Sequence, residues 1–229
     1  DTLIRANAWE RMHHALERGI ETLKTANPDL HIPDLKVLLL LGDPTNRHFM
    51  EEVKGLSAFG GISGYIVISV WPTIDVLNRL EAIVVHELHH NVRYSPGGVV
   101  WDPVTVTVGE HVVAEGLADV FATELYGSHG YTHFVDDQTR NDDSVLAKVA
   151  SGLQVTGMQD FAAWVLGDKT AQLFGAEPVG LPTGAGYAAG VRLVSEYLHL
   201  HGGTAASNVH TPVETVLSDV LPRLGLGDE

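Results

Sequence analysis

Three histidines and a glutamate fill four of the five positions in the segment HELHH, residues 86–90. His86 and His90 are four residues apart, so on a helix their imidazoles project from one face and can reach a single metal ion. Glu87 is displaced around the helix by roughly 100°, which places its carboxylate beside that ion without making it a ligand. His89 points elsewhere. This is the H-E-x-x-H pattern, in which the glutamate takes a proton from water at the metal.

The residues around the motif favour a metal site over a polar surface cluster. Ile83, Val84, Val85 and Leu88 make this stretch apolar. Titratable groups in an apolar helix are costly unless they are paired or bound to a metal. The alternative is a satisfied polar cluster on a partly exposed helix.

A catalytic zinc ion needs a third protein ligand and an open position for water. The next predicted helix, residues 109–126, carries Glu115 and Asp119 four residues apart on one face. Glu115 follows His90 by 25 residues, which is enough chain for the second helix to fold back beside the first. Asp119 can then hydrogen-bond the far nitrogen of a ligating histidine. His111 shares the face of Glu115, so it is an alternative ligand, a group on the wall of the cleft, or a solvent-facing histidine at the start of the helix.

Together these residues resemble the gluzincin arrangement of thermolysin-like and related metallopeptidases. The matching residues are the HELHH segment and AEGLAD, residues 114–119. The resemblance implies that His86, His90 and Glu115 bind zinc, one ion per chain. It also implies that Glu87 is the general base and that Asp119 supports a zinc ligand, His86.

The resemblance extends to the fold and to a narrower family. Zincins place an edge strand beside the active helix, and GYIVISVWP, residues 64–72, is expected to be that strand. An extended peptide would pair with its free backbone groups. The segments GYIVISV, HELHHNVR, AEGLAD and GYAAGVRLV are similar to a bacterial family of predicted zinc-dependent proteases, YjaZ-like, over roughly residues 60–200.

Further polar residues are candidates for the walls of the site. Tyr187 opens the GYAAGVRLV helix between glycines and is a candidate donor to the carbonyl oxygen of a substrate. A core or surface tyrosine is the alternative. Arg192 could contact a substrate carboxylate or Glu115. The alternative is that it is a solvated helix residue. His129 and His133 lie on a loop and are either substrate-side groups or surface histidines.

The surrounding pattern predicts the elements that position these residues. Before the motif we expect a helix over 3–26, a buried strand over 35–41, an irregular connection over 43–63 and a strand over 64–70. The motif helix covers 73–94, capped by Thr73 or Asp75, and an extended segment over 99–108 follows. After the helix over 109–126, which Gly127 ends, come a polar loop over 127–142 and short helices near 143–151, 158–166, 186–200 and 211–219.

Strands confined to the first third of the chain, with helices after them, predict an α+β protein and not alternating β-α-β units. We therefore expect a zincin-like fold with a small N-terminal sheet, an edge strand, the motif helix and a mostly helical C-terminal part. Residues 1–229 are expected to form a single metallopeptidase domain. Within it, residues 1–94 hold the sheet and motif helix, and residues 95–229 hold the glutamate helix and a helical subdomain.

Composition and charge narrow the classes of partner. Cysteine is absent, so disulfides and cysteine-ligated zinc are excluded. The formal net charge of -15 would repel a phosphate backbone, so we expect no nucleic-acid partner. The sequence contains no stretch of about 18 consecutive apolar residues, so we predict no membrane span. We expect a cytoplasmic protein, with secretion after removal of a leader as the alternative, and the sequence leaves the oligomeric state open.

These observations together predict a mononuclear zinc peptidase that acts on a peptide or protein substrate through metal-activated water, with Glu87 as general base. Two alternatives remain. One is a zinc hydrolase of a small amide or a dipeptide. The other is a non-catalytic, zinc-bound regulatory module, although such a module would have no need of a base at Glu87.

Overall fold

The computed structural model describes residues 1–227, which form one small sheet and many helices. They make up two units, each with its own internal packing. Unit 1 comprises Asp1–Val99, Ala118–His133 and Thr204–His210, and of the described residues unit 2 comprises Val100–Leu117, Phe134–Gly203 and those from 211 to 227. The α+β class is confirmed, whereas the single domain with its two contiguous parts remains a prediction.

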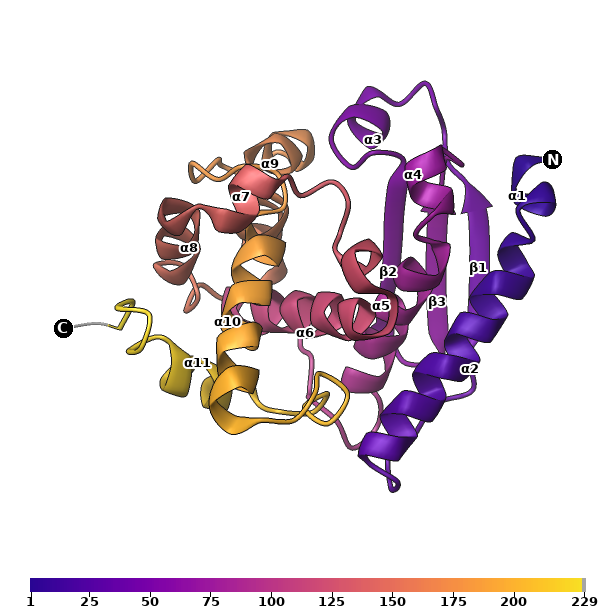
Figure 1. Ribbon diagram of the computed structural model, residues 1–229. Coiled ribbons are helices and arrows are strands. Elements are labelled where there is room, and N and C mark those ends of the chain that lie inside the picture. Colours follow the sequence, from indigo (N-terminus) through magenta and orange to yellow (C-terminus); the bar gives the residue numbers. More distant parts are fainter. Residues whose placement is uncertain (228–229) are drawn as a thin grey trace. The chain divides into compact units, whose positions relative to one another are not determined.

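Unit 1 holds all the strands (Figure 1). Its elements are α1 (Thr2–Arg5), α2 (Ala8–Ala26), β1 (Lys36–Leu41), α3 (Arg47–Glu51), β2 (Leu56–Ile62), β3 (Tyr65–Val70), α4 (Ile74–Leu77), α5 (Leu80–Arg93) and the 3-10 turn η1 (Gly127–Gly130). The helix predicted over 3–26 is thus interrupted, because Asn7 takes a left-handed conformation with φ of 50°. The motif helix is likewise two helices, α4 and α5, and the Thr73 hydroxyl caps the first by accepting from the Val76 N–H.

The sheet corrects two predictions made from the sequence. Its strand order is β1-β3-β2, with β1 parallel and β2 antiparallel to β3. The segment over residues 64–72 therefore supplies the central strand, and β2 is the edge strand that follows α3. Residues 43–63 were expected to be irregular, because two glycines in LSAFGGI weaken its strand pattern, but β2 pairs with β3 in a hairpin that overrides local propensity.

The strand expected to be buried, β1, is largely exposed. Five of its six residues are exposed, and Leu39 is half-buried. An apolar run such as KVLLLL predicts a strand covered on both faces. In this sheet β1 lies at an edge, and no helix among the described residues covers the face opposite α5. The apolar run therefore predicts the presence of a strand correctly and its burial wrongly.

The other face of the sheet is covered by α5, and α2 packs on α5 in turn. On β3, Ile66, Ile68 and Val70 have no exposed surface. A side chain at Gly60 of β2 would lie 2.2 Å from the Glu87 carbonyl oxygen, so the strand touches the helix backbone itself. Arg11 of α2 reaches the start of α5 and donates two hydrogen bonds of 2.6 and 2.7 Å to the Glu81 carboxylate.

Unit 2 is helical apart from one isolated bridge between Thr107 and Thr156. Its elements are α7 (Asp137–Asn141), α8 (Asp143–Ala150), the 3-10 turn η2 (Met158–Asp160), the π-helical turn η3 (Ala162–Leu166), α9 (Asp168–Phe174), α10 (Ala185–His201) and α11 (Val213–Val220). The short helices expected near 143–151, 158–166, 186–200 and 211–219 are found, with the second of them made of η2 and η3. Helix α9 was not predicted, and α7 lies inside the expected polar loop.

Helix α6 (Val108–Tyr126) is continuous, with its first half in unit 2 and its second half in unit 1. It begins where the extended segment over 99–108 ends and stops at Gly127, whose φ of 60° ends the helix as expected. In unit 2 it contacts α10 through backbone. A Cβ on Gly116 would lie 2.2 Å from the Gly190 carbonyl oxygen, and one on Gly190 would lie 2.1 Å from that of Val112. The packing of these two helices thereby explains Gly116 of AEGLAD and Gly190 of GYAAGVRLV.

Candidate metal centre

Helix α5 presents the two motif histidines side by side. The Nε2 atoms of His86 and His90 are 3.1 Å apart, and both side chains are nearly buried. Two nitrogens bound to one tetrahedral zinc at about 2.0–2.1 Å each would lie about 3.3–3.4 Å apart. The observed separation is close to that value, so the pair fits a shared ion with little adjustment.

Asp119 of α6 fixes the orientation of the first of these rings. Its Oδ1 lies 2.9 Å from His86 Nδ1, and only 2% of the residue is exposed. A carboxylate oxygen accepts, so Nδ1 carries the hydrogen and the Nε2 lone pair is left for a ligand. Thr132 supports the same carboxylate, donating from its hydroxyl to Oδ1 at 2.9 Å and from its N–H to Oδ2 at 3.3 Å.

Glu115 completes a group of three possible ligands. It lies one helical turn before Asp119 on α6, and ligand atoms of His86, His90 and Glu115 all lie within 4.8 Å of one another. Two imidazoles and one carboxylate form a donor set that suits zinc and leaves a coordination position open. The residues present therefore fit the metal that the motif predicts.

Glu87 lies beside this group without belonging to it. Across residues 1–227, the cluster of His, Asp and Glu side chains able to hold an ion contains His86, His90 and Glu115 and omits Glu87. Glu87 is 6% exposed and lies on the helix directly after His86. A carboxylate in such a place is suited to proton transfer, because it is near the ion and is not consumed by binding it.

Asn91 ties the neighbouring hairpin to α5. Its Oδ1 accepts from the Gly64 N–H at 2.8 Å, and its Nδ2 is within 2.8–2.9 Å of the carbonyl oxygens of Gly60, Ile62 and Tyr65. The side chain is completely buried. One amide thus satisfies the backbone at the β2–β3 turn, which holds the strand pair in register beside the motif.

The third histidine of the motif faces away from the ligand group. His89 has no exposed surface, and burial lowers its pKa well below the usual histidine value, with the nearby charges of His90 and Arg93 adding to the effect. Its Nε2 lies 3.3 Å from the Ala205 carbonyl oxygen, and its ring contacts Phe121. A buried neutral ring in these contacts serves packing.

The chain returns to α5 from more than a hundred residues downstream. Residues 204–210, here called the strap, contact the face of α5 that carries His89. Arg93 donates from Nη1 to the Val209 carbonyl oxygen at 2.9 Å, and His210 Nε2 lies 2.9 Å from the Val92 carbonyl oxygen. The Ala205 N–H donates to Glu124 Oε1 of α6 at 3.0 Å. The strap therefore links α5 to the C-terminal part of α6.

Two candidates from the sequence lie in unit 2 and contact aromatic rings there. Tyr187 is in the first turn of α10, as expected, is half-buried, and meets Phe134 edge-on with ring centroids 5.5 Å apart. His111 is nearly buried, and its ring centroid lies 4.6 Å from that of Phe161. The group of possible ligands contains Glu115 and omits His111.

The remaining candidates have ordinary structural surroundings. Arg192 donates from Nη2 to Asp143 at 2.6 Å, an ion pair between α10 and α8 in unit 2. His129 is exposed, whereas His133 is half-buried with Nε2 3.2 Å from the Lys54 carbonyl oxygen. Burial lowers the pKa of His133.

The sequence contained no signal for several of the residues that support the site. Thr132 follows Asp119 by 13 positions in a loop, and the strap follows α5 by more than a hundred. The spacing of residues in a sequence indicates only which residues are neighbours along one helix or strand. Contacts between distant segments cannot be predicted from it. Asn91 directly follows the HELHH segment, but the sequence of a helix does not indicate which backbone groups an asparagine in it binds.

The chain is similar to known proteins over most of its length. Residues 8–218 match a family described as predicted Zn-dependent protease (DUF2268). The uncharacterized protein YjfC of Bacillus subtilis (strain 168) is 32% identical over 220 residues, which cover 94% of this chain and 71% of YjfC. No solved structure matches the chain.

Proposed function

Since the chain belongs to the family of predicted Zn-dependent proteases, we propose that it hydrolyses peptide bonds with one zinc ion in a zincin-like, gluzincin-type site. The observation that carries the proposal is the group of His86, His90 and Glu115, with Asp119 on the far nitrogen of His86. The resemblance drawn from HELHHNVR and AEGLAD is confirmed at the level of the family.

In this proposal His86, His90 and Glu115 hold the ion. A bound zinc ion supplies Lewis acidity, which lowers the pKa of water and polarises a carbonyl group. Asp119 keeps His86 in the tautomer whose Nε2 can bind a metal, and Thr132 keeps Asp119 in place. The burial of these groups excludes bulk water and strengthens each electrostatic interaction.

The proton transfers belong to Glu87. Its carboxylate accepts a proton from the attacking water and delivers a proton to the nitrogen of the leaving amine, so one residue serves as base and then as acid. The residue is 6% exposed, so bulk water has little access to its carboxylate. Tyr187 is the proposed donor to the oxygen of the scissile carbonyl, supported by its position in the first turn of α10 and by its half-buried ring.

The test separates metal binding from catalysis. Glu87→Gln keeps the shape of the side chain and removes its basicity. We expect its zinc content to equal that of the wild type while cleavage of a mixed peptide library falls by about 10²–10⁴-fold. Glu10→Gln is the matched control, since Glu10 is an exposed residue of α2 whose loss should change neither quantity.

Unchanged turnover in Glu87→Gln would refute the assignment of the base. Hydrolysis restricted to dipeptides or small amides, and sensitive to Glu87→Gln, would indicate the small-substrate hydrolase instead. Stoichiometric zinc without cleavage of any substrate would indicate a regulatory module.

A further inference from the structure

The face of the sheet opposite α5 is apolar and uncovered. We call it the outer face. The register places Leu38, Val67 and Phe59 in one row across the three strands, with Tyr65 and Ile62 opposite each other in the next. Together with Leu40, these six side chains keep 36–58% of their surface exposed. The patch is therefore continuous across the whole sheet.

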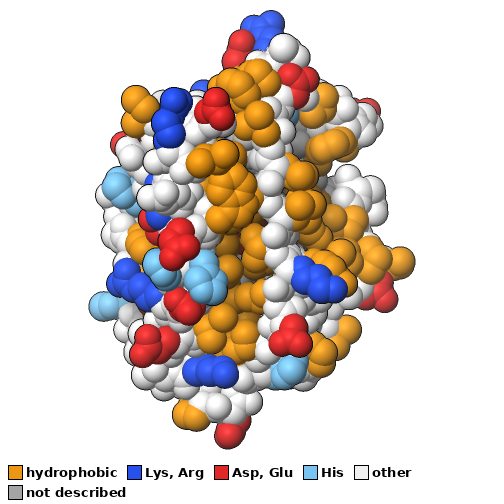
Figure 2. All heavy atoms as spheres, turned by 90° about the vertical axis from the view of Figure 1, so that its right-hand side faces the viewer, with side chains coloured by type: hydrophobic (Ala, Val, Ile, Leu, Met, Phe, Trp, Pro, Cys, Tyr) orange, Lys and Arg blue, Asp and Glu red, His pale blue; other side chains and the backbone are white. Residues whose placement is uncertain are grey.

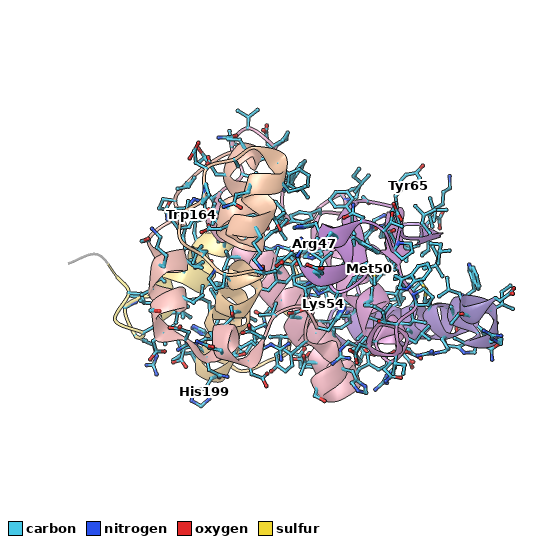
Figure 3. All side chains as sticks on the ribbon, turned by 90° about the horizontal axis from the view of Figure 1, so that it is seen from above. Arg47, Met50, Lys54, Tyr65, Trp164 and His199 are labelled. Carbon is cyan, nitrogen blue, oxygen red and sulfur yellow. The ribbon has the colours of Figure 1, made fainter. Side chains whose placement is uncertain are left out.

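The view of the protein from the side of α1 and β1 shows hydrophobic side chains gathered in broad bands (Figure 2). Tyr65 lies at the margin of the protein when seen from above (Figure 3). A sheet with one solvated face ordinarily alternates apolar and polar residues, and β1 departs from this with five consecutive apolar positions after Lys36. The outer face is thus built like a covered surface.

The area of the patch is that of an interface. An aromatic side chain buries roughly 150–250 Å² in a core, so six half-exposed side chains of this size or slightly smaller present roughly 500 Å². The largest apolar patch on a typical monomer is about 300–600 Å² and often functional. A standard-size interface buries about 800 Å² per partner, of which about 56–65% is apolar. The patch therefore matches the apolar share of such an interface, and the polar residues around it would supply the rest.

The charged side chains on the outer face indicate what kind of molecule could cover it. Among the strand residues that line the outer face, Lys36 is the one with a charged side chain, and its ammonium lies 5.4 Å from the Tyr65 ring centroid. An extended peptide pairs with the edge of a strand and not with side chains on its face. A second copy of the chain also carries a net charge of -15, but the strand residues of its outer face include no acidic side chain, so no acidic groups face each other where the two patches meet.

We propose that the outer face is a homodimer interface, in which two copies pack their sheets face to face about a two-fold axis. Such a contact is isologous, since the same patch serves both partners. Packed sheets lie about 10 Å apart, so side chains from both faces interdigitate and leave the water. Leu38, Phe59 and Val67 form the central row of this interface.

The experiment is a mass measurement by light scattering or sedimentation over about 1–100 μM protein. The wild type is expected at twice the chain mass of 24.7 kDa. Ile62→Glu and Leu38→Glu place a carboxylate in the interface, on different strands, and each should raise the dissociation constant at least about 100-fold. Ile74→Glu and Leu173→Glu are the matched controls, because these residues are exposed on α4 and α9 and should leave the dimer intact.

Thermal melts of all four variants show that each is folded before its mass is compared. A wild type that is monomeric over the whole concentration range would overturn the proposal. A dimer that survives both interface substitutions would also overturn it, since the contact would then lie elsewhere. Binding of the monomer to vesicles of neutral or anionic lipid would assign the outer face to a membrane and would count against the dimer.

Discussion

His86, His89 and His90 share one helix and one residue type but have different surroundings. The Nε2 atoms of His86 and His90 lie 3.1 Å apart, while His89 lies against the strap and Phe121. Replacing each in turn by Gln keeps the size of the side chain and removes the imidazole. We expect His86→Gln and His90→Gln to lose at least tenfold in zinc affinity, and His89→Gln to retain one zinc per chain. Metal analysis after gel filtration measures this, and loss of zinc in His89→Gln would contradict the assignment.

Two substitutions of Asp119 are expected to lower the zinc affinity to different degrees. Asp119→Ala removes the acceptor that fixes the His86 ring, and loss of such a partner typically costs about 10–100-fold in metal affinity. Asp119→Asn restores an oxygen acceptor without the charge, so its affinity should fall between that of Asp119→Ala and the wild type. Titration with a competing chelator measures all three. Equal affinities would show that the contact at 2.9 Å does not influence the metal.

At the level of residues, the motif was readable because its geometry is local. The separation of His86 from His90 is set by one helical turn, and the same holds for Glu115 and Asp119. The family is confirmed, and the roles of these residues remain proposals that the geometry supports. Thr132 and Asn91 were not readable, because their partners are fixed by how distant segments meet.

At the level of elements, the contact between β2 and α5 gives a paired prediction. Gly60→Ala would place a methyl group 2.2 Å from the Glu87 carbonyl oxygen, forcing the strand and helix apart. Such overpacking costs about 1–3 kcal/mol of unfolding free energy, and it should also lower activity because Glu87 moves. Gly61→Ala is the control, since its methyl group would meet only the Phe59 ring, at 3.0 Å.

Chemical denaturation and peptide cleavage assays compare the two glycine variants. Gly61→Ala should be close to the wild type in both, because an exposed ring can move aside. Equal losses in the two variants would mean that the direct approach of β2 to the motif helix has no special role.

Helices and strands could be predicted where the residue pattern was continuous. The predictions were wrong where tertiary contacts determine whether a strand forms or which of its faces is buried. The helices over 109–126 and 186–200 and the strand over 64–70 were predicted close to their observed bounds. Strand β2 was missed because LSAFGGI contains two glycines, one of which the packing on α5 requires. The burial of β1 was wrong because an apolar run indicates a covered strand without indicating which face is covered.

At the level of the whole molecule, each unit is assembled from segments that are far apart in the sequence. The strap joins unit 1 through contacts between residues 116–118 positions apart. Hydrophobic periodicity carries no information at that range. Charge does act at this scale: a net charge of -15 opposes the approach of acidic molecules in general. Among residues 1–227, no helix combines the length and hydropathy needed to cross a membrane.

Metal binding should also stabilise the folded chain as a whole. The three possible ligands lie on α5 and α6, nearly 30 residues apart in sequence, so they come together only in the folded state. A ligand that binds the folded state alone stabilises it by roughly 4 kcal/mol at a free concentration a thousand times its Kd. For a chain of this size that corresponds to a rise in Tm of roughly 10 °C. Calorimetry with excess chelator and with buffered zinc measures the difference, and His90→Gln should show a smaller rise in Tm at the same zinc concentration. A zinc-dependent rise of equal size in His90→Gln would mean that the stabilising ion binds elsewhere.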